Sequence, residues 1–323
     1  MCLGGVTLDA LSMSLSSASS RLIIFCGKGG VGKTTLSLAF GLWNANRGRK
    51  VVVVTSHPLP ELAVTISLHG LKEKYPHAAV NLFVVHIDPR EELANKVKQQ
   101  IPSTFLAKAV LSSRIYQSLI EVAPGLKELA FLSRLRHLAN RQPKEGMASD
   151  FDLLVWDAPA TGHFIQMLKV SRNFDAYLSG PFAMVGRDML EFFSNPGNIS
   201  LFPVTTLEEM AVEETIELCG QLVADLELQP SGVICNLASP LLASSESEYE
   251  KLRSQMLEEN PDAADLRFIL DRHAIERELF RRLRAAVRAV PHVVERKPGW
   301  NSDLELLMDL SEKVGTCLGE GSR

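Results

Sequence analysis

The sequence predicts an α/β protein with a doubly wound, mostly parallel sheet and an inserted helical layer. Short apolar runs alternate along the chain with longer amphipathic stretches, which is typical of repeated βαβ units. Most of the apolar runs are rich in β-branched residues and lack polar alternation, as expected of strands buried on both faces. In addition, a glycine-rich loop joins the first apolar run to a helix-compatible run.

The apolar runs are the expected strands, and the amphipathic stretches between them are the expected helices. The runs lie at Leu22–Cys26, Val51–Thr55, Leu82–Ile87, Leu153–Trp156, Ile199–Val204, Gly232–Cys235 and, more weakly, Pro291–Val294. Toward the C-terminus, Ser244–Glu258 and the arginine-rich Asp262–Ala289 are expected to be helical. The mixture of arginines and acidic residues in the second of these favours a solvated, salt-bridged helix face.

Two gaps between the expected strands are too long for a simple crossover. We therefore expect residues 21–323 to form one domain with helical insertions at about 88–148 and 163–196, preceded by a disordered, Ser-rich tail at residues 1–20. The helices expected in the first insertion are Glu91–Gln100, Thr104–Glu121 and Gly125–Asn140. The second insertion is rich in Phe and Met, which indicates core packing or, alternatively, an apolar surface for a partner.

Composition and charge exclude several classes of function. The 323 residues carry a formal net charge of -4, which gives no support to a nucleic-acid or anionic-membrane partner. The five scattered cysteines include no C-x-x-C pair, which argues against disulfides or a zinc site and for a reducing, cytoplasmic location. No apolar run could span a bilayer, and acidic residues in the expected helix Ser302–Thr316 disfavour direct membrane binding.

The glycine-rich loop predicts a nucleoside triphosphate site, with ATP as the expected ligand. It fits the pattern G-x-x-x-x-G-K-S/T, and it stands between an expected strand and the helix-compatible run Leu36–Ala45, as that pattern requires. The expected phosphate-binding residues are Gly27, Lys28, Gly29, Gly30, Val31, Gly32, Lys33, Thr34 and Thr35.

Each residue type in this loop suits a phosphate ligand. Glycines let successive backbone N–H groups turn toward one anion, and the helix N-terminus adds its dipole. We expect Lys33 to neutralise the β- and γ-phosphates, Thr34 to ligate Mg²⁺ and Thr35 to reach the α-phosphate. Asp157 ends a buried strand, where a carboxylate can hold Mg²⁺ through water.

Several motifs resemble those of one family of ATPases. Because Lys28 precedes the two glycines, the loop is similar to the deviant Walker A of the dimeric ATPases that include MinD, the nitrogenase iron protein and ArsA. The sequence D-A-P-A-T-G-H, which begins at Asp157, resembles switch II of the ArsA family. Residues Phe202–Thr215 and Gly232–Asn236 resemble two further segments of that family, and the resemblance extends from about Arg21 to Gly315.

This resemblance implies roles for two residues and a dimeric assembly. Lys28 would reach across a nucleotide sandwich to the phosphates of a partner subunit; alternatively, it is a surface lysine that touches only its own loop. Asn236 would recognise adenine through its amide; alternatively, it caps the end of a strand. With one such loop per chain, the second subunit would be a copy of this chain or a related ATPase.

The sequence departs from the family in switch I and in its cysteines. His57 stands where the family has an aspartate that orients the attacking water. Three interpretations follow: His57 replaces the carboxylate, hydrolysis is slow, or the active carboxylate comes from a partner. We favour weak or partner-dependent hydrolysis. The cysteines match neither the arsenite site of the arsenite pump nor the zinc clasp of the tail-anchored-protein targeting ATPase.

The leading hypothesis is an ATP- and Mg²⁺-dependent ATPase that acts as a dimeric switch. The inserted helices would open or close an apolar surface for a protein or membrane-protein client. The alternative is a nucleotide-sensing regulatory or positioning protein, like MinD and ParA, with little turnover. A subunit of an arsenite pump ranks below both.

Overall fold

The computed structural model describes residues 21–55, 80–101, 103–122, 125–139, 151–177, 187, 191–195, 197–239, 246–260, 264–296 and 303–319. In these residues the chain forms a seven-stranded sheet of order β3-β2-β4-β1-β5-β6-β7, and every pair of neighbouring strands is parallel. The predicted fold class is therefore confirmed. The strands are β1 (Leu22–Cys26), β2 (Val51–Thr55), β3 (Leu82–His86), β4 (Leu153–Asp157), β5 (Ile199–Thr205), β6 (Val233–Ala238) and β7 (Pro291–Glu295).

The strands at the centre of the sheet differ in burial from those at its edges. Every residue of β1, β2, β4 and β5 is buried, as their continuous apolar runs predict. In the edge strand β3, by contrast, Phe83 and Val85 are exposed. The expectation of burial on both faces is therefore wrong for β3, because a strand at the edge of the sheet is less completely covered than one between two neighbours.

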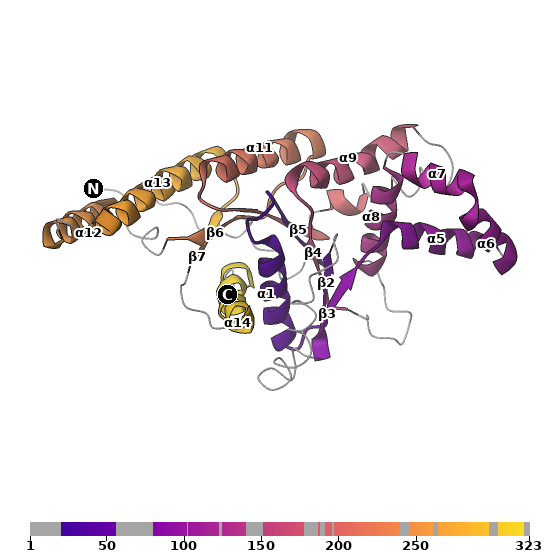
Figure 1. Ribbon diagram of the computed structural model, residues 1–323, viewed down its shortest axis with the longest axis horizontal. Helices are drawn as coiled ribbons and strands as arrows, with labels where there is room; N and C mark the ends of the chain where they lie inside the picture. Colours follow the sequence, from indigo (N-terminus) through magenta and orange to yellow (C-terminus); the bar gives the residue numbers. More distant parts are fainter. Residues whose placement is uncertain are drawn as a thin grey trace.

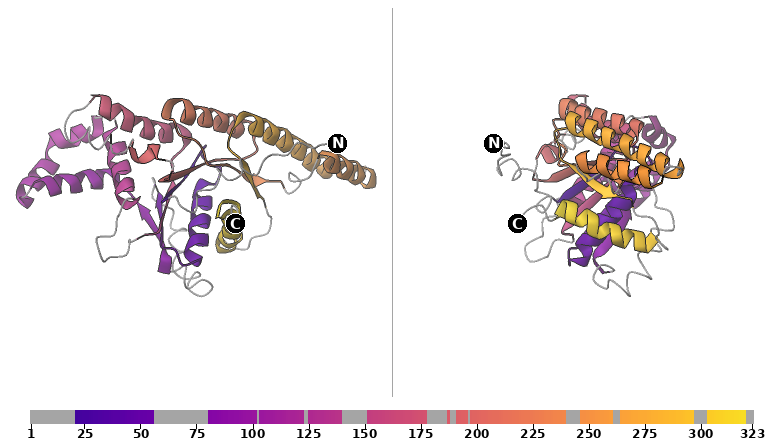
Figure 2. Two further views of the ribbon diagram at one scale, coloured as in Figure 1. Left: turned by 180° about the vertical axis from the view of Figure 1, so that it is seen from behind. Right: turned by 90° about the vertical axis from the view of Figure 1, so that its left-hand side faces the viewer.

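Helices cover both faces of the sheet, as in a doubly wound fold (Figure 1). Helices α1 (Lys33–Asn46) and α14 (Asp303–Gly319) pack on one face, in a core cluster that contains residues of β1 and β2. Helices α8 (Leu126–Ala139), α9 (Thr161–Tyr177) and α11 (Glu209–Leu226) pack on the other. Figure 2 shows the same two layers from behind and from one end.

The C-terminal helix α14 buries its apolar side against α1. Leu307, Leu310 and Val314 are buried in the core cluster that α1 shares, and Gly315 lies so close to the Trp43 ring that a Cβ atom would collide with it. The apolar side of this helix is therefore used for packing within the chain. Of the helices that the structure describes, none combines the length and the apolarity that a membrane span requires.

The inserted helices lie between β3 and β4 in the order α5 (Pro89–Gln100), α6 (Thr104–Ser112), α7 (Arg114–Val122) and α8. The expectation of one helix over Thr104–Glu121 is wrong, because the helix is interrupted at Ser113. The backbone of Ser113 is extended, and its Oγ accepts a hydrogen bond from the N–H of Tyr116 at 3.2 Å. Ser113 thus ends α6 and caps the start of α7.

The Phe- and Met-rich residues of the second insertion belong mainly to the core. Five of them are buried, so core packing is confirmed for Phe164, Met167, Leu168, Phe192 and Phe193. The other residues that motivated an apolar partner surface here lie outside the described residues; they are Phe182, Met184 and Met189.

Helices α12 (Glu246–Glu259) and α13 (Ala264–Ala286) project together from the β7 end of the sheet (Figure 1). The arginines of α13 form ion pairs within the helix and with α11. Arg281 pairs with Glu278 at 2.6 Å, and Arg282 pairs with Glu213 of α11 at 2.7 Å. The expected salt-bridged helix face is therefore confirmed.

Candidate nucleotide-binding site

The candidate site lies at the carboxyl end of β1, in the middle of the sheet. The chain runs from β1 through α1 to β2, which lies on one side of β1 in the sheet. It runs from β4 through α9 to β5, which lies on the other side of β1. Asp157, the last residue of β4, is in register with Phe25 of β1 and with Thr55 of β2. Ligands of open α/β sheets bind at such a point, where the strand order reverses.

Two glycines let the phosphate loop pack against neighbouring strands. Gly27 and Gly32 have φ values of 135° and 90°, in the left-handed region that side chains disfavour. A Cβ atom on Gly27 would collide with the carbonyl oxygen of Val204 in β5, and one on Gly32 would collide with the amide of Asn236 in β6. The loop thus forms a cradle of backbone that a side chain would fill.

Lys33 places a buried cation inside this cradle. Its Nζ donates hydrogen bonds to the carbonyl oxygens of Gly27 at 2.9 Å and Lys28 at 2.8 Å. Burial lowers the pKa of Lys33, and the nearby carboxylate of Asp157 acts in the opposite direction. A partly desolvated cation among backbone groups is well suited to exchange its carbonyl partners for phosphate oxygens.

Thr34 and Asp157 supply a pair of oxygen atoms beside the loop. The Thr34 hydroxyl donates to Asp157 Oδ2 at 2.6 Å, and the two residues are 123 positions apart in the sequence. A hydroxyl and a carboxylate are oxygen ligands of the kind that Mg²⁺ prefers, so these residues fit the ion that the sequence predicts. Thr35, also expected to contact phosphate, is half-buried in the first turn of α1.

Asn236 is buried against the phosphate loop, with 4% of its surface exposed. Its Nδ2 donates to the carbonyl oxygen of Val31 at 2.8 Å, which fixes the orientation of the amide. Its Oδ1 has no hydrogen-bond partner among the described residues. Buried polar atoms are rarely left in this state, so Oδ1 is a candidate acceptor for a donor on a ligand.

Lys28 contacts a residue outside its own loop. Its Nζ lies 3.8 Å from Oε2 of Glu214 in α11, and both side chains are about one third exposed. The alternative of a lysine that touches only its own loop is therefore wrong. His57, the candidate water-positioning residue, lies outside the described residues.

Three side chains at or beside this site were given no individual role from the sequence, although Thr161 belongs to the T-G-H motif. Glu214 is one, as the partner of Lys28. The others are Thr55 at the end of β2 and Thr161 at the start of α9, whose hydroxyl oxygens are buried without a hydrogen-bond partner among the described residues. Thr55 is the last residue of the buried strand β2, and Thr161 comes four positions after the buried strand β4. This position at the carboxyl ends of the strands is the signal by which they could have been found.

The start of α9 is connected directly to the inserted helices. The ring of Trp156, next to Asp157, packs against Phe164 of α9 at 5.4 Å and Phe131 of α8 at 5.5 Å between ring centroids. In addition, His163 Nε2 lies 3.7 Å from Glu128 Oε1 of α8. A displacement of the start of α9 would therefore act on α8 through these contacts.

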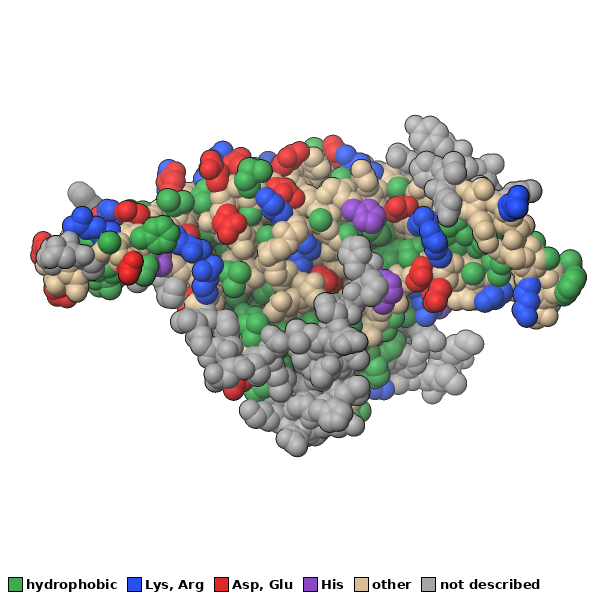
Figure 3. Space-filling model, viewed as in Figure 1, with side chains coloured by type: hydrophobic (Ala, Val, Ile, Leu, Met, Phe, Trp, Pro, Cys, Tyr) green, Lys and Arg blue, Asp and Glu red, His purple; other side chains and the backbone are tan. Residues whose placement is uncertain are grey.

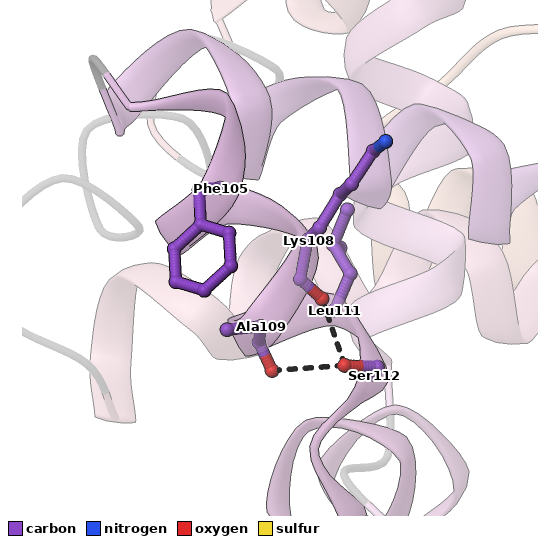
Figure 4. Close-up of a pocket in the computed structure, with 5 residues that line it drawn as sticks. All are labelled: Phe105, Lys108, Ala109, Leu111 and Ser112. Carbon is purple, nitrogen blue, oxygen red and sulfur yellow. Dashed lines mark hydrogen bonds between the residues drawn. The ribbon is translucent and has the colours of Figure 1, made fainter.

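Helix α6 carries an exposed apolar surface at the far end of the inserted helices. Phe105 is 79% exposed, and Leu106 and Val110 are exposed beside it. Figure 3 shows hydrophobic side chains on the surface at this end of the molecule. Residues of α6 line a hollow of about 580 Å³. Phe105 and Lys108 are two of the lining residues, which Figure 4 draws as sticks.

Three of the four cysteines that the structure describes are buried. Cys26, Cys219 and Cys235 are buried, and burial raises the pKa of Cys219 and of Cys235 to about 12. Burial therefore favours the thiol form, whereas a soft metal ion is bound by the thiolate. Among the described residues, no group of three or more His, Cys, Asp or Glu side chains could hold a metal ion.

Comparison with known proteins identifies related ATPases. Putative arsenical pump-driving ATPase 2 of Aquifex aeolicus is 31% identical over 166 residues, which cover 49% of this chain and 52% of that protein. The arsenical pump-driving ATPase of Acidiphilium multivorum is 24% identical over 259 residues, or 75% of this chain and 43% of that protein. ATPase BagA of Mycobacterium tuberculosis is 27% identical over 234 residues, with 68% and 66% covered.

The chain thus spans about half the length of the first two relatives. The sequence model of the anion-transporting ATPase family matches residues 20–186, which is more than half of the chain. The matched region contains the phosphate loop, Asp157 and the T-G-H sequence that begins α9. The chain belongs to the anion-transporting ATPase family, also called the ArsA family.

Proposed function

We propose that this chain binds ATP with Mg²⁺, hydrolyses it, and acts as a nucleotide-driven dimeric switch that controls an apolar surface for a protein client. The observation that carries this proposal is the contact of Thr34 with Asp157 at 2.6 Å beside the buried Lys33. It joins a phosphate cradle to a pair of Mg²⁺ ligands at the end of the central strands. The family membership of the chain supports the same activity.

The residues of the cradle divide the work of binding. Lys33 and the backbone N–H groups of the loop stabilise negative charge on the β- and γ-phosphates. Thr34 and Asp157 hold Mg²⁺, which supplies further neutralisation of charge on the phosphates. Asn236 offers Oδ1 to the exocyclic amino group of adenine. Because Nδ2 already donates to the Val31 carbonyl oxygen, Oδ1 is the amide atom that faces the base. Guanine would present an acceptor to Oδ1 where adenine presents its amino group, and two acceptors cannot form a hydrogen bond.

Water near the γ-phosphate needs a group that orients it. His57 takes the place of the family's aspartate, and we keep the hypothesis that hydrolysis is weak or depends on a partner. Thr55 and Thr161 place two buried hydroxyl groups at the same edge of the sheet, where they can assist in positioning. Hydroxyl groups orient water but are poor bases at neutral pH, which agrees with slow turnover.

Dimerisation would use Lys28. The pair that it forms with Glu214 is long and partly exposed, and such pairs stabilise a protein by only about 0–1 kcal/mol. Lys28 can therefore leave Glu214 at low cost when the phosphates of a second subunit come within reach. A copy of this chain and a related ATPase subunit are both candidate partners.

The coupling of the nucleotide to a client would pass through α9 and α8. The Phe131–Trp156–Phe164 ring contacts and the His163–Glu128 contact join the start of α9 to α8. Helix α8 is in turn tied to α5, since Lys96 donates to Ser133 at 2.7 Å. Helix α6, with its exposed Phe105, follows α5 in the chain. Binding of ATP would thereby alter the apolar surface of α6.

The first experiment tests catalysis. Phosphate release is measured with ATP and Mg²⁺ for the wild type and for Asp157→Asn, with Asp152→Asn, near the start of the same strand, as the matched control. The expected result is loss of at least about tenfold in the rate for Asp157→Asn alone, as is typical when a catalytic charge is removed. Equal and measurable rates for all three proteins would contradict the proposed site.

The second experiment tests the dimer. The mass of the protein is measured by light scattering with ATP, Mg²⁺ and, for slow turnover, a non-hydrolysable ATP analogue. We expect a dimer for the wild type and for Glu214→Gln, and a monomer for Lys28→Ala. A wild-type monomer under every condition would instead indicate a different subunit as the partner.

The third experiment tests switch I. Single-turnover cleavage of ATP is compared between the wild type and His57→Asp. If hydrolysis is limited by the missing carboxylate, the aspartate variant is faster, by about 10²-fold for a restored water-positioning group. A fast wild type that gains nothing from the aspartate would show that His57 or another group already suffices.

The fourth experiment tests coupling to the apolar surface. Hydrogen exchange of residues 104–112 is followed with and without the ATP analogue. We expect the analogue to change exchange in the wild type and to have a smaller effect in Glu128→Gln. Identical responses in the two proteins would remove the proposed path through α8.

A further inference from the structure

The end of strand β6 is irregular at the residue that faces the phosphate loop. Pairing of β6 with β7 shifts in register between Cys235 and Ala238, and Leu237 inside this bulge has a φ of 56°. A left-handed backbone is unfavourable for a residue with a branched side chain. Bulges re-aim the side chains beside them, and here the affected side chain is Asn236.

A buried carboxylate from another element holds this bulge. Glu276 of α13 is only 7% exposed, and its Oε2 accepts a hydrogen bond from the backbone N–H of Ser239 at 2.9 Å. Its Oε1 accepts from Nε of Arg272 at 3.3 Å, which supplies a compensating charge. Burying a carboxylate is costly, so its use on one backbone N–H directly after the bulge indicates a specific task.

The same cluster also contains His273, which contacts the Ser239 hydroxyl through its ring. A serine, a histidine and a glutamate together invite comparison with a nucleophilic triad. In such a triad the carboxylate orients the histidine. Here the two oxygens of Glu276 bind Ser239 N–H and Arg272 instead. The arrangement therefore ties the end of β6 to α13 and does not activate a hydroxyl.

We infer that Glu276 is a positioning residue that fixes the β6 bulge, and with it the Asn236 amide, so that the site prefers adenine to guanine. This inference rests on the proposed role of Asn236 in recognising the base. Ser239 lies three positions after Asn236, so loss of the Glu276 bond loosens the backbone on the carboxyl side of the bulge, which then keeps the bond from Arg296 N–H to the Ala238 carbonyl oxygen at 2.7 Å. The amide can then turn or withdraw, and Oδ1 no longer meets the adenine amino group.

The test measures the ratio of affinities for two nucleotides. Dissociation constants of fluorescent ATP and GTP analogues are determined for the wild type, Glu276→Gln and Glu276→Ala. Leu279→Ala is the matched control, because Leu279 is buried on the same helix but makes no bond to Ser239. Asn236→Ala reports on base recognition itself, and thermal unfolding of each protein reports on stability.

A graded loss of preference is expected. The ATP preference falls by about tenfold in Glu276→Ala, which corresponds to about 1.4 kcal/mol. It falls by about twofold to threefold in Glu276→Gln, since a neutral acceptor is weaker than a charged one. Leu279→Ala lowers the unfolding temperature and leaves the ratio unchanged. Exchange of the Ser239 amide hydrogen accelerates in the same order as the preference falls.

The outcomes separate this inference from the proposed function. If Asn236→Ala removes the preference while both Glu276 variants keep it, Asn236 recognises the base and the role of Glu276 is overturned. If Asn236→Ala changes nothing, both ideas are wrong. If Leu279→Ala lowers the ratio as much as Glu276→Ala does, the effect belongs to α13 packing in general and the inference also fails. Should Glu276→Ala not fold, an unchanged ratio in Glu276→Gln overturns it.

Discussion

Three glycines of the phosphate loop provide a graded test of the site geometry. Gly29 has no left-handed backbone and would place a Cβ atom in open space. Gly30 has a φ of 86°, also with open space around a Cβ atom. Gly32 has a φ of 90°, and its Cβ atom would collide with the Asn236 amide. Substitution by alanine therefore adds no strain at Gly29, backbone strain alone at Gly30, and backbone strain with a collision at Gly32.

The expected losses of unfolding free energy follow from these differences. Gly29→Ala should change stability by less than about 0.5 kcal/mol, as is usual at an exposed position. Gly30→Ala should cost about 1–2 kcal/mol for a left-handed alanine. Gly32→Ala adds to that strain about 1–3 kcal/mol, because it drives Asn236 from the Val31 carbonyl and leaves a buried amide unpaired. Its total is about 2–5 kcal/mol.

The assay is reversible urea unfolding without nucleotide, followed by circular dichroism. A double-mutant cycle with Asn236→Ala isolates the collision, because Gly32→Ala then costs only its backbone strain. The expected coupling between the two positions is about 1–3 kcal/mol. Equal costs for Gly30→Ala and Gly32→Ala, or a cycle that is additive within about 0.5 kcal/mol, would refute the contact between the loop and Asn236.

Three further predictions concern packing, charge and pH. Leu310→Ala should cost about 2–5 kcal/mol of unfolding free energy in urea, since this side chain is buried in the cluster that α1 shares. Phe268→Ala should cost less than about 0.5 kcal/mol, because the Phe268 side chain on α13 is exposed, and similar costs for the two variants would show that α14 is not docked. Glu214→Gln should cost less than about 1 kcal/mol without nucleotide, because its pair with Lys28 is partly exposed; a larger loss would mean that Lys28 is not readily released. Burial lowers the pKa of His292 in the folded protein below its ordinary value of 6.5. Between the lowered pKa of the folded protein and the ordinary pKa of the unfolded chain, the unfolded chain binds more protons, so the free energy of unfolding falls as the pH drops from 6.5. His292→Gln should therefore lose less stability between pH 7 and pH 5 than the wild type does, and parallel pH profiles of unfolding free energy would contradict this.

Much of the fold is encoded locally. Strands β1 and β2 have the predicted bounds, because a parallel strand covered on both faces needs an unbroken apolar run. The single helix expected over Thr104–Glu121 is interrupted at Ser113, whose side chain accepts a hydrogen bond from the backbone N–H of Tyr116. Edge positions such as β3 were not predictable, since strand order depends on contacts between distant segments.

The candidate site divides in the same way. The glycines, Lys33 and Thr34 were identified because their spacing serves one anion, and Asp157 because it ends a buried strand. Glu214 carries no such spacing, so its place beside the loop emerges only when α11 is docked on the sheet. Thr161 belongs to the T-G-H motif, but the burial of its hydroxyl oxygen emerges only in the structure. The exposed apolar side of α6 likewise depends on which helix neighbours cover it.

The sequence by itself determined that this chain has a parallel α/β sheet, a phosphate loop and the motifs of the ArsA family. These features depend on residues that are close together in the chain. Tertiary structure decided that Oδ1 of Asn236 is the amide atom available to a base, since Nδ2 donates to the Val31 carbonyl oxygen, 205 positions away in the sequence. It also decided that the apolar side of α14 is buried on α1. Contacts of this kind follow from how whole elements pack, and no local pattern of residues specifies them.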